Sequence, residues 1–465
     1  MVLIPFLALL LLGCVIAFLD WRRGWYLAIV CGVLQDPVRK MTTGTPVVIT
    51  FSVVLVYLCI LLASHQTLRS ALADIGKRFA PLYLATTLFL VILVVAAING
   101  LITYGFQYWK APALSFIIYM MPIPALLLGY SFYRRDEDLV PLIVFYSVLT
   151  SVALIGVILE YQQMPWSALG LVAATEGANV RMLPGIQLTM LAGFYRGPDI
   201  LAWHAATLAM IGIAMALRAR VIRAAWPWIA TAAWGVLACF LSGRRKALYM
   251  LLVFAVLFVW RYMRRLTAPQ AVSFATMGLA LFFITHRLST SERTDAYVRA
   301  AATTQNEIFR RLEGGLGVTI EQSGIMGAGL GTATQGTQHF TTTSYSWQEG
   351  GLSKLAIEVG VPGVILVALL LFLFVNYMLK ITRAPDEPGT SQLLRCMLMA
   401  MVIANVANFT ASAQAYSDPL LTLMTAFFGG CLLATAATES RIAATARETT
   451  GSASGGPPRA AALPA

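Results

Sequence analysis

The sequence alternates between long apolar segments and short polar ones. A transmembrane helix needs about 20 apolar residues, and in lipid every backbone amide must be paired within the protein, which favours helices. The pattern therefore predicts an all-α, polytopic membrane helix bundle of 12–13 transmembrane helices. The apolar segments lie at about 2–19, 46–64, 81–99, 112–132, 139–159, 198–217, 225–242, 247–260, 271–286, 351–378, 393–412 and 418–437, with a shorter one at 25–35.

Composition supports a membrane protein and excludes several other classes. The chain is 58% hydrophobic and 12% charged, with a mean hydropathy of +0.75, whereas soluble domains are about 25% charged. This excludes a soluble enzyme, a disordered scaffold and a secreted disulfide framework. An outer-membrane barrel is excluded because its strands alternate in polarity. The six cysteines lie in or beside apolar runs without CxxC spacing, so we interpret them as packing residues.

Basic residues predict the topology, because cytoplasmic loops are enriched in Lys and Arg. Basic clusters fall in every second loop, and we expect those loops to be cytoplasmic. The orientation of the first two segments stays open, since Arg22 and Arg23 compete with Arg39 and Lys40 for the inside. The first apolar run lacks a preceding basic region and a cleavage pattern, which predicts a retained anchor.

This topology divides the chain into six parts. We expect the chemistry in the two long outer loops. Helical spacing of apolar residues in the second of these loops predicts an amphipathic helix, and the Ala-, Ser- and Gly-rich tail predicts disorder. The parts are N-terminal transmembrane helices over 1–160, a periplasmic loop over 161–197, central transmembrane helices over 198–286, a large late periplasmic loop with the amphipathic helix over 287–350, C-terminal transmembrane helices over 351–437 and a disordered cytoplasmic tail over 438–465.

Several arginines map to the predicted outer side, where the topology rule disfavours positive charge. A guanidinium group grips phosphate oxygens in bidentate fashion, so as a set these arginines favour a binding site for a lipid diphosphate. For any single arginine the alternative is contact with ordinary lipid phosphates. The candidates are Arg181, Arg196, Arg244, Arg245, Arg310 and Arg311.

The large outer loop carries two further features. The run GIMGAGLGT over 324–332 is neither a Walker loop nor a dinucleotide fingerprint, and both close approach to a ligand and a plain turn remain open. Polar and aromatic residues then precede the next span. Interfacial aromatics are typical of membrane belts, but beside a carboxylate they also suit sugar binding. These residues are His339, Tyr345, Trp347, Gln348 and Glu349.

Three segments resemble the O-antigen ligase and O-antigen polymerase superfamily, bacterial inner-membrane glycosyltransferases of GT-C type. The first is GFYRGPDILAWHAA (193–206), and the second is LSGRRKAL (241–248). The third combines 310–332 with EGGLSKLAIEVGVPG (349–363). The resemblance places Arg245 on the family's essential arginine. It places Glu349 and Gly350 where the family has histidine and asparagine, which is a departure.

The resemblance implies metal-independent transfer of a glycan at the periplasmic face of the bacterial inner membrane, without a cofactor. The donor would be an undecaprenyl-diphosphate-linked glycan and the acceptor a glycan or glycolipid, with membrane lipids but no nucleic acid as further partners. The arginines would hold the diphosphate and balance its charge. Glu349 is the first candidate for the general base and His339 the second, with Tyr345, Trp347 and Gln348 as sugar-binding candidates.

We expect a polysaccharide polymerase acting on O-antigen or exopolysaccharide. The nearest alternative is an O-antigen ligase that acts on lipid A-core, because both reactions use one donor and differ in the acceptor. A polysaccharide or lipid transporter is the alternative of another class. The absence of a convincing repeat between the two halves and the few ionisable residues within the apolar segments disfavour it.

Overall fold

Helices form almost all of the described chain, as the apolar pattern predicts. The computed structural model describes residues 2–170, 180–183, 186–219, 221–262, 319–334, 350–383, 391–413 and 415–453, with single positions between 268 and 317. In these residues the one sheet is an antiparallel hairpin of β1 (Val180–Leu183) and β2 (Ile186–Thr189). The helices are α1 (Leu3–Leu19), α2 (Trp21–Met41), η1 (Val47–Phe51), α3 (Ser52–Ala63), α4 (His65–Arg78), α5 (Ala80–Tyr104), η2 (Phe106–Tyr108), α6 (Lys110–Met120), α7 (Pro122–Phe132), α8 (Asp136–Ala153), α9 (Ile155–Tyr161), α10 (Pro198–Arg218), α11 (Ile222–Leu241), α12 (Arg245–Tyr262), α16 (Gly351–Ile381), α17 (Gln392–Ala411), η5 (Ala415–Ser417) and α18 (Pro419–Ala453).

The all-α, polytopic bundle is confirmed. Among the described residues, 8 helices are long and apolar enough to cross a membrane. The number is 9 if η1 and α3 count as one span with α4, from which they are bent by 77°. The helix α1 is apolar but shorter, with 17 residues. The helix α12 carries basic residues at both ends. Most of the predicted segment over 271–286 lies outside the described residues.

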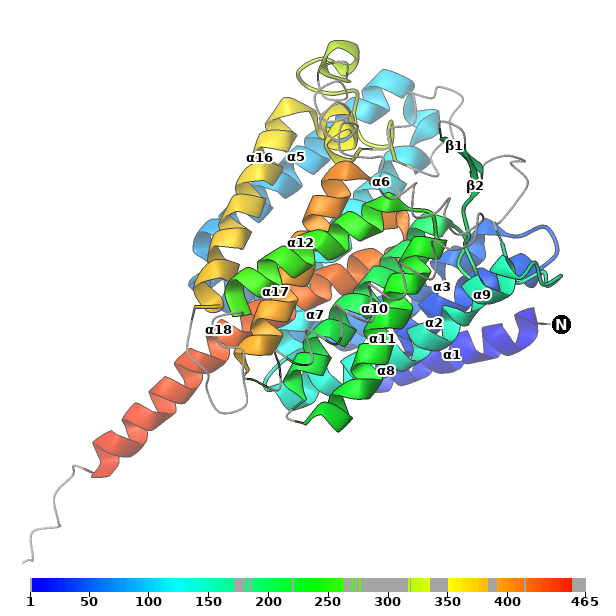
Figure 1. The fold of residues 1–465 in the computed structure, drawn as a ribbon. Helices are drawn as coiled ribbons and strands as arrows, with labels where there is room; N and C mark the ends of the chain where they lie inside the picture. Colours follow the sequence, from blue (N-terminus) through cyan, green and yellow to red (C-terminus); the bar gives the residue numbers. More distant parts are fainter. Residues whose placement is uncertain are drawn as a thin grey trace, which may run out of the picture.

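The last helix continues further than the composition predicts. Figure 1 shows α18 leaving the bundle as a single helix, which extends to Ala453. It therefore enters the stretch from 438 onward that we expected to be disordered. The residues just after 436 include several Ala, Glu and Arg, which favour helix even where no apolar face requires it.

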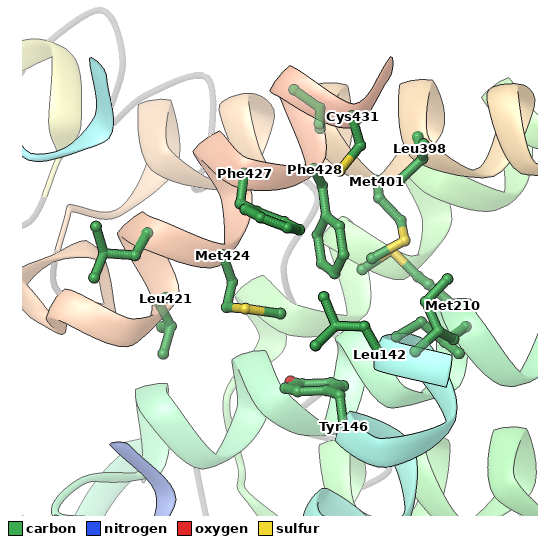
Figure 2. Packing of buried hydrophobic residues seen from close by; sticks show 14 of the residues in the cluster. Leu142, Tyr146, Met210, Leu398, Met401, Leu421, Met424, Phe427, Phe428 and Cys431 are labelled. Atoms are coloured by element: carbon green, nitrogen blue, oxygen red, sulfur yellow. The ribbon is translucent and has the colours of Figure 1, made fainter. Parts of the chain in front are cut away.

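The helix α10 forms the centre of the bundle, with 94% of its apolar window buried. The helices α17 and α18 are each 72% buried, whereas α5 and α16 are only 28% and 33% buried and present apolar side chains outward, as expected of helices that face lipid. Figure 2 shows the core formed by α8, α10, α17 and α18, where Tyr146 of α8 and Met210 of α10 lie near Met401 of α17 and Phe428 of α18.

The described loops lie at the two ends of the bundle. At one end, which we call the Arg196 end, Arg196 contacts Asp418 at 2.8 Å and Lys40 Nζ donates to the carbonyl of Gly193 at 2.8 Å. At the opposite end, Arg22 lies 3.6 Å from Asp138. The helix α2 thus runs from the loops predicted to be cytoplasmic to the Arg196 end.

A carboxylate fixes the third motif inside the bundle. Gly360, with φ of 67°, interrupts α16, and the glycine run over 324–331 packs against this break. The side chain of Glu358 is fully buried and accepts hydrogen bonds from five donors. The donors are Ser115 Oγ at 3.3 Å, Tyr119 Oη at 2.7 Å, the backbone N–H of Gly331 at 3.1 Å and of Ala333 at 3.2 Å, and Thr334 Oγ1 at 2.7 Å.

The glycines of this run therefore approach the protein's own helices. The Ala328 amide donates to the carbonyl of Ile357 at 2.7 Å, and the Leu330 amide donates to the carbonyl of Ala96 at 3.0 Å. A Cβ atom at Gly329 would collide with the backbone of Gly100 in α5. Of the two possibilities for GIMGAGLGT, a turn packed on α5 and α16 accounts for the glycines at these positions.

Replacing Glu358 by Ala is expected to lower the free energy of unfolding by about 3 kcal/mol, because buried donors lose their acceptor. The measurement is the thermal stability of the purified protein in detergent, followed by size-exclusion chromatography. Glu137→Ala, at an exposed carboxylate, serves as the control and should leave stability unchanged. Equal stability of the two variants would contradict the assignment of Glu358 as the anchor of this loop.

Candidate functional site

The structure describes the side chains of three of the six arginines predicted to bind a diphosphate. Arg196, Arg244 and Arg245 all lie at the Arg196 end of the bundle. Arg181 belongs to β1, and nothing is described of its side chain. Residues of the large loop lie outside the described part of the chain, so their predicted roles remain predictions. They are Arg310, Arg311, His339, Tyr345, Trp347, Gln348 and Glu349.

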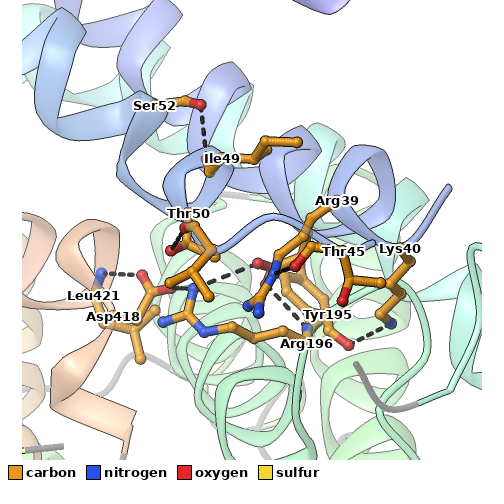
Figure 3. A network of polar contacts seen from close by, with 12 residues as sticks. Arg39, Lys40, Thr45, Ile49, Thr50, Ser52, Tyr195, Arg196, Asp418 and Leu421 are labelled. Carbon is orange, nitrogen blue, oxygen red and sulfur yellow. Dashed lines mark hydrogen bonds and ion pairs between the residues drawn. The ribbon is translucent and has the colours of Figure 1, made fainter. Parts of the chain in front are cut away.

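Arg196 joins three helices through buried ion pairs (Figure 3). Its Nη1 lies 2.8 Å from Asp418 Oδ2, before α18, and 3.4 Å from Asp36 Oδ1 in α2. Its backbone N–H also donates to Asp36 Oδ2 at 3.0 Å. Burial opposes the charge of Arg196, but the Asp418 and Asp36 carboxylates outweigh it and raise the pKa of the guanidinium. Burial raises the pKa of Asp418, although Arg196 counteracts it.

These contacts define what Arg196 does in the described structure. One guanidinium lies between two carboxylates, and Arg39 also lies close enough to act on the charges of Asp36 and Arg196. The Arg196 side chain is 17% exposed and that of Asp418 is 3% exposed. Arg196 therefore holds α2, α10 and α18 together, and a diphosphate would have to compete with Asp36 and Asp418 for it.

Three basic residues follow one another where the turn ends and α12 begins. Gly243 has a φ of 67° and a Cβ there would lie 3.1 Å from the side chains of Leu188 and Met190, so this tight turn beside the hairpin requires glycine. Arg244 Nη2 lies 2.9 Å from Asp199 Oδ2 near the start of α10. Lys246 Nζ donates to Ser412 Oγ at 2.8 Å. Arg245, the first residue of α12, is buried.

One nitrogen of Arg244 is left without a partner among the described residues. Its Nε is buried and has no hydrogen-bond partner among the residues that the structure describes. A buried, unpaired donor on a charged group is costly. An additional anionic or polar group at this position would satisfy it, which is the property expected of an arginine in an anion-binding site.

The three segments that carry the family resemblance meet at this end. The Arg244–Asp199 pair joins the second segment to the first. The second also contacts the end of α17 through Ser412. The third segment contains Gly351, the first residue of α16. A Cβ atom at Gly351 would collide with the backbone oxygen of Phe409, which lies three residues before Ser412 in the chain. Segments far apart in sequence thus surround the end of α17.

Sequence reasoning missed the acidic partners and one lysine. Asp36 and Asp418 lie at the ends of apolar segments, where a charge is not remarkable in sequence. Lys354, by contrast, stands four residues before Glu358 within an apolar segment, and an ionisable residue in such a segment signals function by default. Lys354 is 5% exposed. Its place within the third motif was the available signal.

Among the described residues, no group of three or more His, Cys, Asp or Glu side chains could hold a metal ion. No model of a known protein family matches the chain, and no curated protein matches it. The likeness to the O-antigen ligase and polymerase superfamily therefore depends on the three segments alone.

Replacing Arg196 by Gln is expected to destabilise the protein by about 3 kcal/mol, because it leaves two buried carboxylates without their cation. Adding Asp418→Asn should restore part of this loss. Thermal unfolding in detergent measures both effects. The control is Arg23→Gln, whose ion pair with Asp20 is exposed, at 80% and 42% for the two side chains, and should change stability by less than about 0.5 kcal/mol. A stable Arg196→Gln variant would contradict this role.

Proposed function

We propose that the protein is a glycosyltransferase of the bacterial inner membrane that moves a glycan from undecaprenyl diphosphate to an acceptor sugar on the periplasmic side. The observation that carries the proposal is the buried Nε of Arg244, which has no partner among the described residues. Arg244 is the first of three successive basic residues at the meeting point of the three motifs. A diphosphate fits such a donor set, because arginine offers planar, permanently charged hydrogen-bond donors to phosphate oxygens.

In the proposed reaction the acceptor hydroxyl attacks the anomeric carbon of the donor sugar. The bond from that carbon to the diphosphate oxygen breaks, and the electron pair leaves with undecaprenyl diphosphate. Cationic side chains at the Arg196 end stabilise the charge that develops on the leaving group. A general base accepts the hydroxyl proton, and Glu349 is our first candidate for it, with His339 as the second.

The proposal assigns different tasks to the three arginines. Among the described residues Arg244 has one carboxylate partner, at 2.9 Å, and one buried donor without a partner, so it is suited to contact the diphosphate. Arg245 follows it directly and coincides with the essential arginine of the resembling family. Arg196 is engaged by Asp36 and Asp418 and positions the start of α10, from which Asp199 orients Arg244.

We favour a polymerase over a ligase because Glu349 and Gly350 replace the histidine and asparagine of the family motif. A strain that lacks the gene distinguishes the two activities. Short or absent capsule or exopolysaccharide with normally capped lipopolysaccharide supports the polymerase. Normal polysaccharide with uncapped lipopolysaccharide supports the ligase instead.

Arg245→Ala and Glu349→Gln are each expected to lower glycan transfer at least about 100-fold, through loss of charge stabilisation and of the base. The assay uses purified protein in nanodiscs with an undecaprenyl-diphosphate-linked oligosaccharide, and product length is read by gel electrophoresis. Arg383→Ala, at an exposed arginine beyond the opposite end of α16, is the matched control and should retain activity.

Full activity of Glu349→Gln would assign the role of general base to His339 or another residue. Transport of labelled lipid-linked glycan by the reconstituted protein, unaffected by Arg245→Ala, would overturn the transferase and favour a transporter.

A further inference from the structure

Two charged side chains outside the three motifs hold the backbone just before α10. Glu160, near the end of α9, accepts hydrogen bonds through Oε2 from the N–H of Ala192 at 2.8 Å and of Gly193 at 2.5 Å. Lys40, near the end of α2, donates from Nζ to the carbonyl of Gly193 at 2.8 Å. It also donates to the carbonyl of Tyr195 at 2.6 Å (Figure 3). One side chain therefore binds amides and the other binds carbonyls of the same short segment.

This segment, residues 192–195, is called the clamped segment below, and it packs directly on α9. Gly193 has a φ of 56°, and a Cβ there would come within 2.9 Å of the backbone nitrogen of Val157. A Cβ at Gly156 would likewise come within 2.8 Å of the backbone nitrogen of Phe194. The two stretches of backbone are therefore in contact, and the charged side chains fix a segment that already lies against its support.

Charged groups make this clamp stronger than neutral ones would. Lys40 is 9% exposed, and it lies close enough to Glu160 for the two opposite charges to attract each other. Hydrogen bonds to or from an ionised group are shorter and stronger than those between neutral groups. Four such bonds on four residues of backbone leave the clamped segment little freedom to move.

Both ends of the clamped segment lead to the turn that carries Arg244. Before the segment, the side chains of Leu188 and Met190 lie 3.1 Å from the position that a Cβ at Gly243 would occupy. After the segment, Asp199 Oδ2 lies 2.9 Å from Arg244 Nη2. The cationic turn is thus contacted from two sides by residues whose places depend on the clamped segment.

We infer that Glu160 and Lys40 are positioning residues for the proposed diphosphate site. By fixing the clamped segment they place Arg196 and the start of α10, from which Asp199 orients Arg244. Cations that are fixed in advance lose little freedom when they bind an anion. Neither Glu160 nor Lys40 contacts the lipid in this scheme. The inference rests on the proposed function for the identity of the anion and adds two residues outside the motifs.

Binding of undecaprenyl diphosphate, which carries no glycan to transfer, tests the inference apart from catalysis. The full-length protein in detergent is titrated with undecaprenyl diphosphate and with neutral undecaprenol, and binding is followed by native mass spectrometry. Glu160→Ala and Lys40→Met should each weaken binding of the diphosphate about tenfold. Both variants should leave binding of undecaprenol unchanged, which a general loss of structure would not do.

A conservative variant separates positioning from a role of the negative charge itself. Glu160→Gln keeps a carbonyl oxygen that can accept both N–H hydrogen bonds, so it should retain most of the affinity for undecaprenyl diphosphate. Glu321→Ala removes an exposed carboxylate from the described part of the large outer loop. It is the matched control and should behave as wild type.

Hydrogen–deuterium exchange reports on the clamp directly, because the amides of Ala192 and Gly193 donate to Glu160. Glu160→Ala and Lys40→Met should speed exchange over residues 190–197 while α17 exchanges at the wild-type rate. Glu160→Gln should stay close to wild type over the same residues. Faster exchange throughout the protein, without a local excess at 190–197, would count against the clamp.

Unchanged binding of undecaprenyl diphosphate by Glu160→Ala, or loss of binding in Glu160→Gln equal to that in Glu160→Ala, would overturn the inference. Its failure is distinct from failure of the proposed function. Glu160-dependent binding of the diphosphate without any glycan transfer supports the clamp and counts against the transferase. Glycan transfer by the wild type, with binding that does not depend on Glu160 or Lys40, does the reverse.

Discussion

The buried carboxylate of Glu358 is the interaction on which the proposed site depends. Its five donors come from α6 and from the glycine-rich loop, so one side chain joins the loop, α6 and the broken helix α16. The hydrocarbon core of a bilayer offers no water to an unpaired polar group, so these hydrogen bonds favour one arrangement of the loop, α6 and α16. The arrangement also uses both carboxylate oxygens of Glu358 for hydrogen bonds.

The buried guanidinium of Arg196 joins another set of helices in a similar way. Arg196 connects α2, α10 and α18 by contacts with Asp36 and Asp418. The consequence for function is indirect: by fixing the start of α10, these pairs place Asp199 where it orients Arg244. Sequence reasoning assigns Arg196 to a ligand, but in the described structure it has a positioning task. The donor without a described partner belongs to Arg244 instead.

Much of the fold could be predicted from hydrophobicity because a bilayer imposes a length and a composition on each spanning helix. The break at Gly360 could not be predicted, since it depends on a loop about 30 residues upstream that packs into it. The partners of Arg196 could not be predicted either, because Asp36 and Asp418 are 160 and 222 positions away in the chain.

The position of the groups at the Arg196 end suggests how the leaving group of the proposed transfer would be held. Arg244 is held by Asp199 at the start of α10, and Lys246 donates to Ser412 after α17. In the proposed transfer the cations at this end would balance the charge that develops on a diphosphate leaving group. Their contacts with α10 and with the end of α17 fix them before any substrate arrives, so little reorganisation would be needed during the reaction.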